Sequence, residues 1–279
     1  MFRATQFALF VALLFAMSAA AQATAIPLVG KPGTTLLADG FEGVSPGSAP
    51  VAVTGTWGIA TSAGGGGTVL VRDQTYSSFA AYEGSQYVEF SGNSAGMDGF
   101  YASLRGTFGA GSDLGDTLTE QVAFRVVSGG GFFLSFERGG ESFPNQTNVI
   151  AGLFIVGPSG YPYGTLSPNH VYAIHSEWGD YIDTGAEADS TRWNTLSVTH
   201  TNGQTGPTSW SFSLNGEPTV PFNGVTAIGD KTWQRTGFTA VQEYNPRIYL
   251  DAVPEPGTIV LLGTGLLGLL AYAWRRRRA

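Results

Sequence analysis

Residues 193–198 read Trp-Asn-Thr-Leu-Ser-Val and residues 210–216 read Trp-Ser-Phe-Ser-Leu-Asn-Gly, and these two stretches decide the fold class. In the first, Leu196 and Val198 alternate with polar residues, as in a strand that buries one face. In the second, Asn215-Gly216 follows Leu214, and Asn-Gly is the strongest short turn signal. We therefore predict strands over Thr195–Thr201 and Ser209–Leu214, with a tight turn after the second.

The rest of the body has the same character. Short apolar or alternating runs are separated by Gly, Pro, Asn and Ser, and no long stretch has helical periodicity with caps. The 40 glycines favour tight turns over helix interiors. Further predicted strands are Thr68–Arg72, Gln86–Phe90, Phe100–Phe108, Leu118–Val127, Phe132–Glu137, Asn148–Val156, Val171–His175 and Arg247–Asp251. Together they predict an all-β fold, a single β-sandwich of the jelly-roll type over residues 26–252.

Charge and cysteine content exclude several partners and chemistries. Of the 14 basic residues, five are arginines near the chain ends, and the remaining nine face 21 acidic residues, so the body carries about −12. A body of this charge is expected to bind neither nucleic acid nor an anionic membrane surface. The chain has no cysteine. Disulfides, cysteine nucleophiles, thiolate zinc sites and iron–sulfur clusters are therefore excluded.

The first 25 residues read as a secretory signal peptide. Arg3 gives a short basic start, and residues 7–20 are almost wholly apolar. Ala21-Gln22-Ala23 is an A-x-A cleavage site, and Ala23-Thr24-Ala25 is an alternative one. The other interpretation of this segment is a buried N-terminal helix. A signal peptide predicts export, with signal peptidase as a processing partner.

The other end of the chain, residues 253–279, reads as a membrane-anchoring tail. Residues 253–257, Val-Pro-Glu-Pro-Gly, precede an apolar run from Thr258 to Trp274. At about 1.5 Å per residue, this run reaches the lower limit for a helix that crosses a bilayer. Four arginines follow at once: Arg275, Arg276, Arg277 and Arg278. They are expected to stop the helix on the cytoplasmic side, which leaves the body on the far side of the inner membrane.

A Pro-Glu-Pro motif, a short apolar helix and an arginine cluster, in this order, resemble the PEP-CTERM sorting tail. The resemblance implies that an exosortase recognises Val253, Pro254, Glu255 and Pro256 and processes the tail. It also implies a Gram-negative host that makes exopolysaccharide. The precursor would be anchored in the inner membrane with its body in the periplasm, and the protein would then reach the cell surface or the extracellular matrix. The alternative is a plain C-terminal anchor that is never cut.

A second resemblance concerns the body. The stretches at 193–198 and 210–216 resemble paired strands of concanavalin A-like or laminin G-like jelly rolls. Residues 39–43 and 248–251 resemble the first and last strands of related carbohydrate-binding modules. This likeness implies that Asp39, Glu42 and Asp251 hold a structural Ca²⁺, and no other cofactor is required. The alternative is that Asp39 and Asp251 merely end strands in solvent.

Residues 177–189 form an acidic stretch with Glu177, Asp180, Asp183, Glu187 and Asp189. One hypothesis is Ca²⁺ binding, and another is that Glu177 and Asp183 act as a glycosidase acid/base pair. However, the E-x-x-D-x-x-D spacing differs from the E-x-D-x-x-E of laminarinase-like jelly-roll hydrolases, and the start of an EF-hand loop is missing. We therefore expect a solvated loop.

Aromatic residues near turns give a carbohydrate-binding hypothesis. Tyr161, Tyr163, Trp178 and Tyr181 lie in a loop-like third of the chain, and flat rings on loops can stack on sugar faces. The alternative is that aromatic side chains fill the core. We predict a core position for Trp193 and Trp210.

Motifs for catalysis are missing from the sequence. The histidines, His170, His175 and His200, have no metal-ligand spacing, and no G-x-S-x-G elbow occurs. We therefore predict no catalytic residue and no enzyme activity. The predicted function is a structural or adhesive role beside exopolysaccharide. The alternatives are a lectin-like module and, less strongly supported, a glycan-processing enzyme that uses Glu177.

Overall fold

The computed structural model describes residues 24–25, 28–29, 35–37, 41–50, 56–61, 67–92, 101–107, 117–138, 149–161, 165–174, 181–201, 209–217, 220–223, 233–241, 247–251, 253–254 and 276. The regular structure in these segments is almost entirely β-strand. The all-β prediction is therefore confirmed. Residues 1–23 of the predicted signal peptide (1–25) and the predicted membrane helix 258–274 lie outside the described residues, whereas Thr24 and Ala25 form the short strand β1. Among the described residues, no helix has the length and apolar character needed to span a membrane.

One sheet has seven antiparallel strands. Their order is β12 (Tyr181–Glu187), β11 (His170–Ile174), β10 (Val149–Val156), β9 (Gly131–Arg138), β16 (Trp233–Val241), β7 (Tyr101–Thr107) and β4 (Thr56–Thr61). The late strand β16 lies between β9 and β7, and β12 forms an edge of the sheet. Segments far apart in the sequence therefore complete one another in this sheet.

The second sheet has nine strands. Its main path is β15 (Val220–Asn223), β14 (Ser209–Leu214), β13 (Asn194–Thr201), β8 (Thr117–Ser128), β17 (Arg247–Asp251), β6 (Gln86–Ser91) and β5 (Thr68–Asp73). β2 (Leu28–Val29) pairs with both β8 and β3 (Thr35–Leu37). β17 lies between β8 and β6, so the last long strand is central to the sheet. A separate two-stranded ladder joins β1 (Thr24–Ala25) to β18 (Val253–Pro254).

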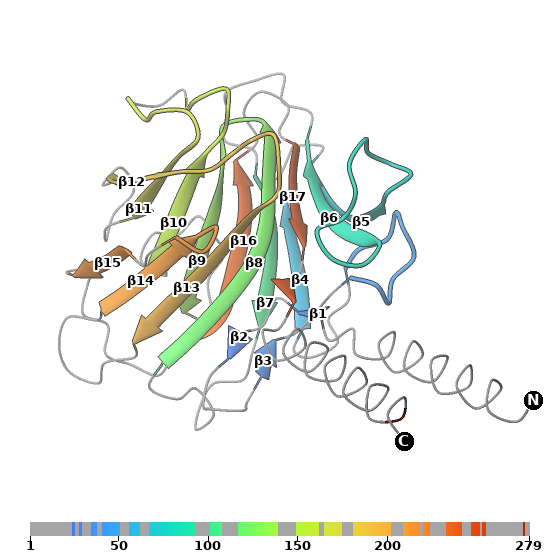
Figure 1. The fold of residues 1–279 in the computed structure, drawn as a ribbon, viewed down its shortest axis with the longest axis horizontal. Coiled ribbons are helices and arrows are strands. Elements are labelled where there is room, and N and C mark those ends of the chain that lie inside the picture. Colours follow the sequence, from blue (N-terminus) through green and yellow to red (C-terminus); the bar gives the residue numbers. More distant parts are fainter. Residues whose placement is uncertain are drawn as a thin grey trace, which may run out of the picture.

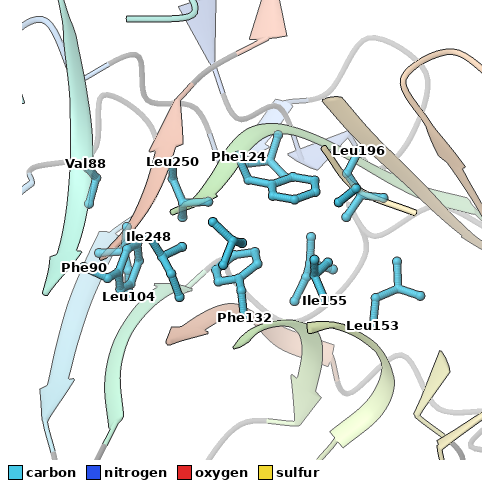
Figure 2. Packing of buried hydrophobic residues seen from close by; sticks show 14 of the residues in the cluster. Val88, Phe90, Leu104, Phe124, Phe132, Leu153, Ile155, Leu196, Ile248 and Leu250 are labelled. Carbon is cyan, nitrogen blue, oxygen red and sulfur yellow. The ribbon is translucent and has the colours of Figure 1, made fainter. Parts of the chain in front are cut away.

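The two sheets pack against each other, and the main core lies between them (Figures 1 and 2). Because side chains alternate along a strand, Phe132 and Leu134 of β9 both point into this core and are fully buried. Phe124 of β8 and Leu250 of β17 meet them from the opposite sheet. The rings of Phe124 and Phe132 stack with centroids 6.1 Å apart. This packing confirms the β-sandwich prediction.

Most predicted strands are confirmed. Ser209–Leu214 and Arg247–Asp251 have the predicted bounds, and the others differ by one residue at one or both ends. The solvated loop expected over the acidic stretch is wrong for residues 181–187, which form β12. β12 pairs on one side with β11 and leaves most of its side chains partly or fully exposed. Its carboxylates therefore stay in water while its backbone is hydrogen-bonded, and charge alone does not separate an edge strand from a loop.

The predicted Asn-Gly turn is also confirmed. Asn215 and Gly216 have φ values of 53° and 76°, and the Glu217 N–H donates to the Leu214 carbonyl at 2.9 Å. Positive φ at both central residues is the signature of a type I′ turn, which Asn and Gly tolerate best. The side chain of Asn215 also accepts the Thr195 N–H at 2.9 Å. The turn is thus attached to the start of β13.

Candidate functional site

The exposed edge of the seven-stranded sheet carries a histidine between two carboxylates. His170 Nδ1 lies 3.0 Å from Asp183 Oδ2, and His170 Nε2 lies 3.2 Å from Glu187 Oε1. Both contacts are satisfied when both ring nitrogens carry a proton. The Gly185 N–H, followed by His170, lowers the pKa of Asp183 from its ordinary value of 3.8. This group, the His170 clamp, therefore joins β11 to β12 through side-chain contacts.

This clamp bears on the acid/base hypothesis for the acidic stretch. Asp183 already accepts the Gly185 N–H at 2.9 Å and contacts His170. Asp189 accepts the hydroxyl and the N–H of Thr191 at 2.6 and 2.9 Å. Glu177 and Asp180 lie outside the described residues. The carboxylates that the structure describes in this stretch thus serve hydrogen bonds that hold local structure.

A second aromatic cluster covers the face of the seven-stranded sheet that points away from the main core. Phe133, Phe154 and Tyr172 form it, and their strand neighbours Phe132, Ile155 and Val171 point the other way. The rings of Phe133 and Phe154 stack with centroids 4.2 Å apart. Two of the four predicted sugar-binding aromatics, Tyr161 and Tyr181, pack against this cluster.

Tyr161 and Tyr181 are brought together by the fold. Their ring centroids lie 5.0 and 5.5 Å from that of Phe154, and 6.4 Å from each other. Burial, together with the neighbouring Tyr161 hydroxyl, raises the pKa of Tyr181 well above its ordinary value. Both residues are half-buried, so each leaves part of its surface exposed. Tyr163 and Trp178 lie outside the described residues.

A cavity of about 420 Å³ lies between the edges of the two sheets. β12, the turn after it, β14 and the Asn215-Gly216 turn supply its lining residues: Thr184, Gly185, Ala186, Glu187, Arg192, Phe212, Leu214, Asn215 and Glu217. Sequence analysis does not identify this cavity. Its lining residues come from β12 and its following turn, and from β14 and its following turn, about 30 residues later in the chain. β12 pairs with β11 in the seven-stranded sheet, whereas β14 pairs with β13 in the nine-stranded sheet.

The carboxylates expected to bind calcium hold a loop. Glu42 Oε1 accepts the N–H groups of Ser85 and Gln86 at 2.7 and 2.8 Å, and Glu42 Oε2 accepts the Ser85 hydroxyl. Asp251 Oδ2 accepts the N–H groups of Tyr82 and Glu83 at 2.7 and 3.0 Å. Both predicted ligands thus reach the same loop before β6, whereas Asp39 lies outside the described residues. Among those described, no group of three His, Asp or Glu side chains could hold a metal ion.

The same loop covers the outer face of the nine-stranded sheet. Its Phe79 ring lies 4.8 Å from Tyr249 and 5.8 Å from Trp193, measured between centroids. Trp193 is half-buried here and donates its indole N–H to the Ala80 carbonyl at 2.9 Å. The predicted core position of Trp193 is therefore wrong, because the strand alternation that points Leu196 inward places Trp193 outside the sandwich. The side chain of Trp210 is not among those described.

An ion pair lies beneath this loop. Arg72 Nε is 2.7 Å from Glu89 Oε2, and the Glu89 side chain is fully buried. The Arg72 guanidinium also lies 3.9 Å from the centre of the Tyr76 ring. The outer face of the nine-stranded sheet is therefore a packed polar and aromatic layer, in which Glu89 Oε1 and Arg125 Nε are buried without a hydrogen-bond partner among the described residues.

The start of the predicted sorting motif belongs to the folded body. Val253 and Pro254 form β18 and pair with Ala25 and Thr24, respectively. Glu255, Pro256, Arg275, Arg277 and Arg278 lie outside the described residues, and Arg276 is exposed. Residues 252–278 match the family model of the PEP-CTERM protein-sorting motif.

The tail is a PEP-CTERM sorting motif. The motif implies processing by an exosortase and a precursor that is exported and anchored in a membrane. It covers a small part of the chain, so it identifies the tail and leaves the body unassigned. No curated protein matches the chain.

Several solved structures are similar to the body at low identity. A carbohydrate esterase, vb_24B_21, from the Shiga toxin-encoding bacteriophage phi24B is 15% identical, with 71% of this chain and 88% of that chain covered and a TM-score of 0.44. The endo-β-1,4-glucuronan lyase of the fungus Trichoderma reesei is 9% identical, with 70% of this chain and 88% of that chain covered and a TM-score of 0.45. Peanut lectin is 11% identical, with 70% of this chain and 97% of that chain covered and a TM-score of 0.39. Likenesses at these scores assign neither a ligand nor an activity to this chain, and the concanavalin A-like jelly roll stays a prediction.

Proposed function

We propose that the chain is an exported protein of the cell surface or extracellular matrix, sorted by an exosortase, with a structural or adhesive role beside exopolysaccharide. The observation that carries this proposal is the junction between body and tail. The sorting motif begins at residue 252, directly after Asp251 ends β17, and β17 is a central strand of the nine-stranded sheet. The domain that the tail would sort is therefore the sandwich itself.

A non-catalytic role accords with the described site chemistry. In the His170 clamp and in the Arg72–Glu89 pair the side chains contact one another, although Glu89 Oε1 is buried without a hydrogen-bond partner among the described residues. Neither includes a hydroxyl nucleophile or a carboxylate pair that is available to a substrate in the part of the chain described. Polysaccharide contact is the second element of the proposal, and a lectin-like module is its more specific form. The juxtaposition of Tyr161 and Tyr181 at one edge of the sandwich favours that form.

Sorting is tested by mass spectrometry of the protein recovered from the cell surface. We expect peptides up to the Pro254-Glu255-Pro256 region and none from Leu261 to Trp274. Deletion of the exosortase should retain the whole tail in the membrane fraction. Recovery of Leu261–Trp274 in surface protein would contradict processing and leave a plain anchor.

The adhesive role is tested separately, by calorimetry of the processed protein against the exopolysaccharide of its own host, with and without Ca²⁺. Saturable binding supports the adhesive and lectin-like forms of the proposal. The lack of any heat of binding in both conditions would contradict them, and the sorting result would still stand.

A further inference from the structure

We propose that the cavity between β12 and β14 binds a segment of a glycan chain that carries no acidic groups. This inference rests on the proposed role beside exopolysaccharide and names the place and the class of sugar. The cavity volume of about 420 Å³ lies within the range of about 300–1,000 Å³ that is common for sites of small organic ligands.

The floor of the cavity is apolar. Phe212 and Leu214 of β14 line it, although 1% and 5% of their surface is exposed, and Ala186 of β12 packs on the same core. A sugar ring presents C–H groups on its faces and hydroxyls around its edge. Because Phe212 and Leu214 are buried, little of this floor is open to a ligand, and a sugar would be held chiefly through its hydroxyls at the rim, with the half-buried Ala186 beside its C–H groups.

The rim supplies acceptors and donors for those hydroxyls. The main chain of Glu217 closes the Asn-Gly turn, while its carboxylate has no hydrogen-bond partner in the part of the chain that the structure describes. Arg192 Nε pairs with Asp189 Oδ2 at 3.0 Å, and the other guanidinium N–H groups sit on a side chain that is 68% exposed. A carboxylate with acceptor capacity thus shares one cavity with a guanidinium that has donors to spare.

The walls of the cavity are held in place before any ligand binds. The Thr184 hydroxyl donates to the Val171 carbonyl at 2.7 Å, and the Ala186 N–H reaches the Thr184 hydroxyl at 3.2 Å. On the other wall, Asn215 is hydrogen-bonded to Asn194 and Thr195. Walls fixed in this way lose little conformational entropy on binding, which favours affinity.

The charge of the rim selects against acidic sugars. Glu187 and Glu217 both line the cavity. Arg192 is paired with Asp189, and His170 contacts Asp183 and Glu187, so four carboxylates here meet two basic side chains. The rim is therefore net negative, as is the chain with its formal charge of −7. A uronate, sulfate or phosphate group would meet like charge here, whereas neutral and amino sugars would not.

The experiment is calorimetry of the processed protein, recovered from the cell surface, with three tetrasaccharides and with the host exopolysaccharide. The tetrasaccharides are a neutral β-glucan (cellotetraose), an amino sugar (chitosan tetramer) and an acidic one (tetraglucuronate). We expect binding of at least one of the first two and no measurable binding of the third. Both positions are exposed. Glu217→Gln, which is isosteric, and Arg192→Gln, which removes the guanidinium, should each weaken binding by about tenfold. Glu83→Gln, in the loop before β6, is the matched control and should bind like the wild type.

Each result has one meaning. Tetraglucuronate binding as tight as that of the other two sugars would overturn the assigned ligand class. Exopolysaccharide binding that is equal in the wild type, E217Q and R192Q would overturn the cavity as the site and leave the proposed function intact. Failure of the wild type to bind the exopolysaccharide would count against the proposed function itself. Far-ultraviolet circular dichroism of each variant confirms that the sandwich is folded.

Discussion

The side-chain amide of Asn215 donates a hydrogen bond of 3.0 Å to the side-chain carbonyl of Asn194. Asn194 is 1% exposed, and its carbonyl also accepts the Asp189 N–H, while its amide donates to the carbonyls of Asp189 and Arg192. Two asparagines thus tie the turn after β14 to the start of β13 and to the turn that follows β12. A buried amide with every hydrogen bond made specifies one arrangement of these three segments.

Replacing Asn215 should separate its two roles. We expect Asn215→Ala to lower the free energy of unfolding by about 2–3 kcal/mol, because it loses the side-chain bonds and forces a Cβ residue without polar compensation into positive φ. Asn215→Gly should cost about 1 kcal/mol less, since glycine tolerates a φ of 53°. Urea unfolding measures both values. Equal losses for the two variants would show that the backbone conformation contributes nothing.

The ion pair of Arg72 and Glu89 should behave as a buried pair. Arg72→Met leaves the fully buried carboxylate without its partner, and we expect a loss of about 3–4 kcal/mol in the free energy of unfolding. The double variant Arg72→Met/Glu89→Gln should recover at least half of that loss, because no isolated charge stays behind. A double-mutant cycle from urea unfolding measures the coupling. Additive losses would mean that the pair does not interact.

Hydrogen bonds from protein N–H groups already engage Glu42 and Asp251 at the loop before β6. We therefore expect EDTA to leave the Tm of the protein unchanged. Glu42→Gln should lower the free energy of unfolding by about 1–2 kcal/mol through the weakened bonds to Ser85 and Gln86. Thermal unfolding followed by circular dichroism gives both answers. A drop in Tm with EDTA, restored by Ca²⁺, would instead show that Asp39, Glu42 and Asp251 hold the ion that the family resemblance implies.

Alkaline pH should destabilise the protein through Tyr249. Burial, with the charge of Glu89 as a further cause, raises the pKa of Tyr249 to about 12 from an ordinary value of 10. The unfolded chain therefore loses this proton at lower pH than the folded chain, and stability falls as the pH rises from 10 to 12. Tyr249→Phe should make that decline shallower. Urea unfolding between pH 9 and 12 measures the slope, and an identical slope in the variant would contradict the assignment.

Acidic pH should act on the edge clamp. Because the folded pKa of Asp183 is lowered, its contribution to stability is present above the unfolded value of 3.8 and is lost as the pH falls through the folded pKa. The carboxylate is 44% exposed, so solvent screening keeps this contribution small. Asp183→Asn should therefore flatten the acid limb of the stability curve, which urea unfolding between pH 2 and 6 measures. A steeper acid limb in D183N would reverse the sign of this argument.

Most of the fold is predictable from local patterns in the sequence. Alternation of apolar and polar residues identifies Thr195–Thr201, and the Asn-Gly pair locates the turn after Leu214, because both depend on the residues of one segment. Which strands become neighbours depends on contacts between distant segments. The insertion of β16 between β9 and β7, and the edge position of β12, therefore cannot be obtained from period and turn signals.

The candidate site is predictable to a smaller extent. Tyr161 and Tyr181 are recognisable as aromatic residues near turns, and the structure brings them together, but their partial burial against Phe154 depends on the sheet that lies behind them. The cavity has no sequence signal, since Phe212 and Glu217 join it with Glu187 through the packing of two sheets. Likewise, Trp193 looks like a core residue until the face of its strand is known.

The ladder between β1 and β18 means that the chain leaves the sandwich where it enters it. In Figure 1, β1 lies to the right of centre, whereas β12 and β14 lie to the left. A body held by its tail is therefore attached on the side of the β1–β18 ladder, and the cavity lies toward the side of β12 and β14. Cleavage after Ala23 would keep Thr24 and Ala25 and therefore the ladder, whereas cleavage after Ala25 would remove β1 and leave β18 without the strand it pairs with.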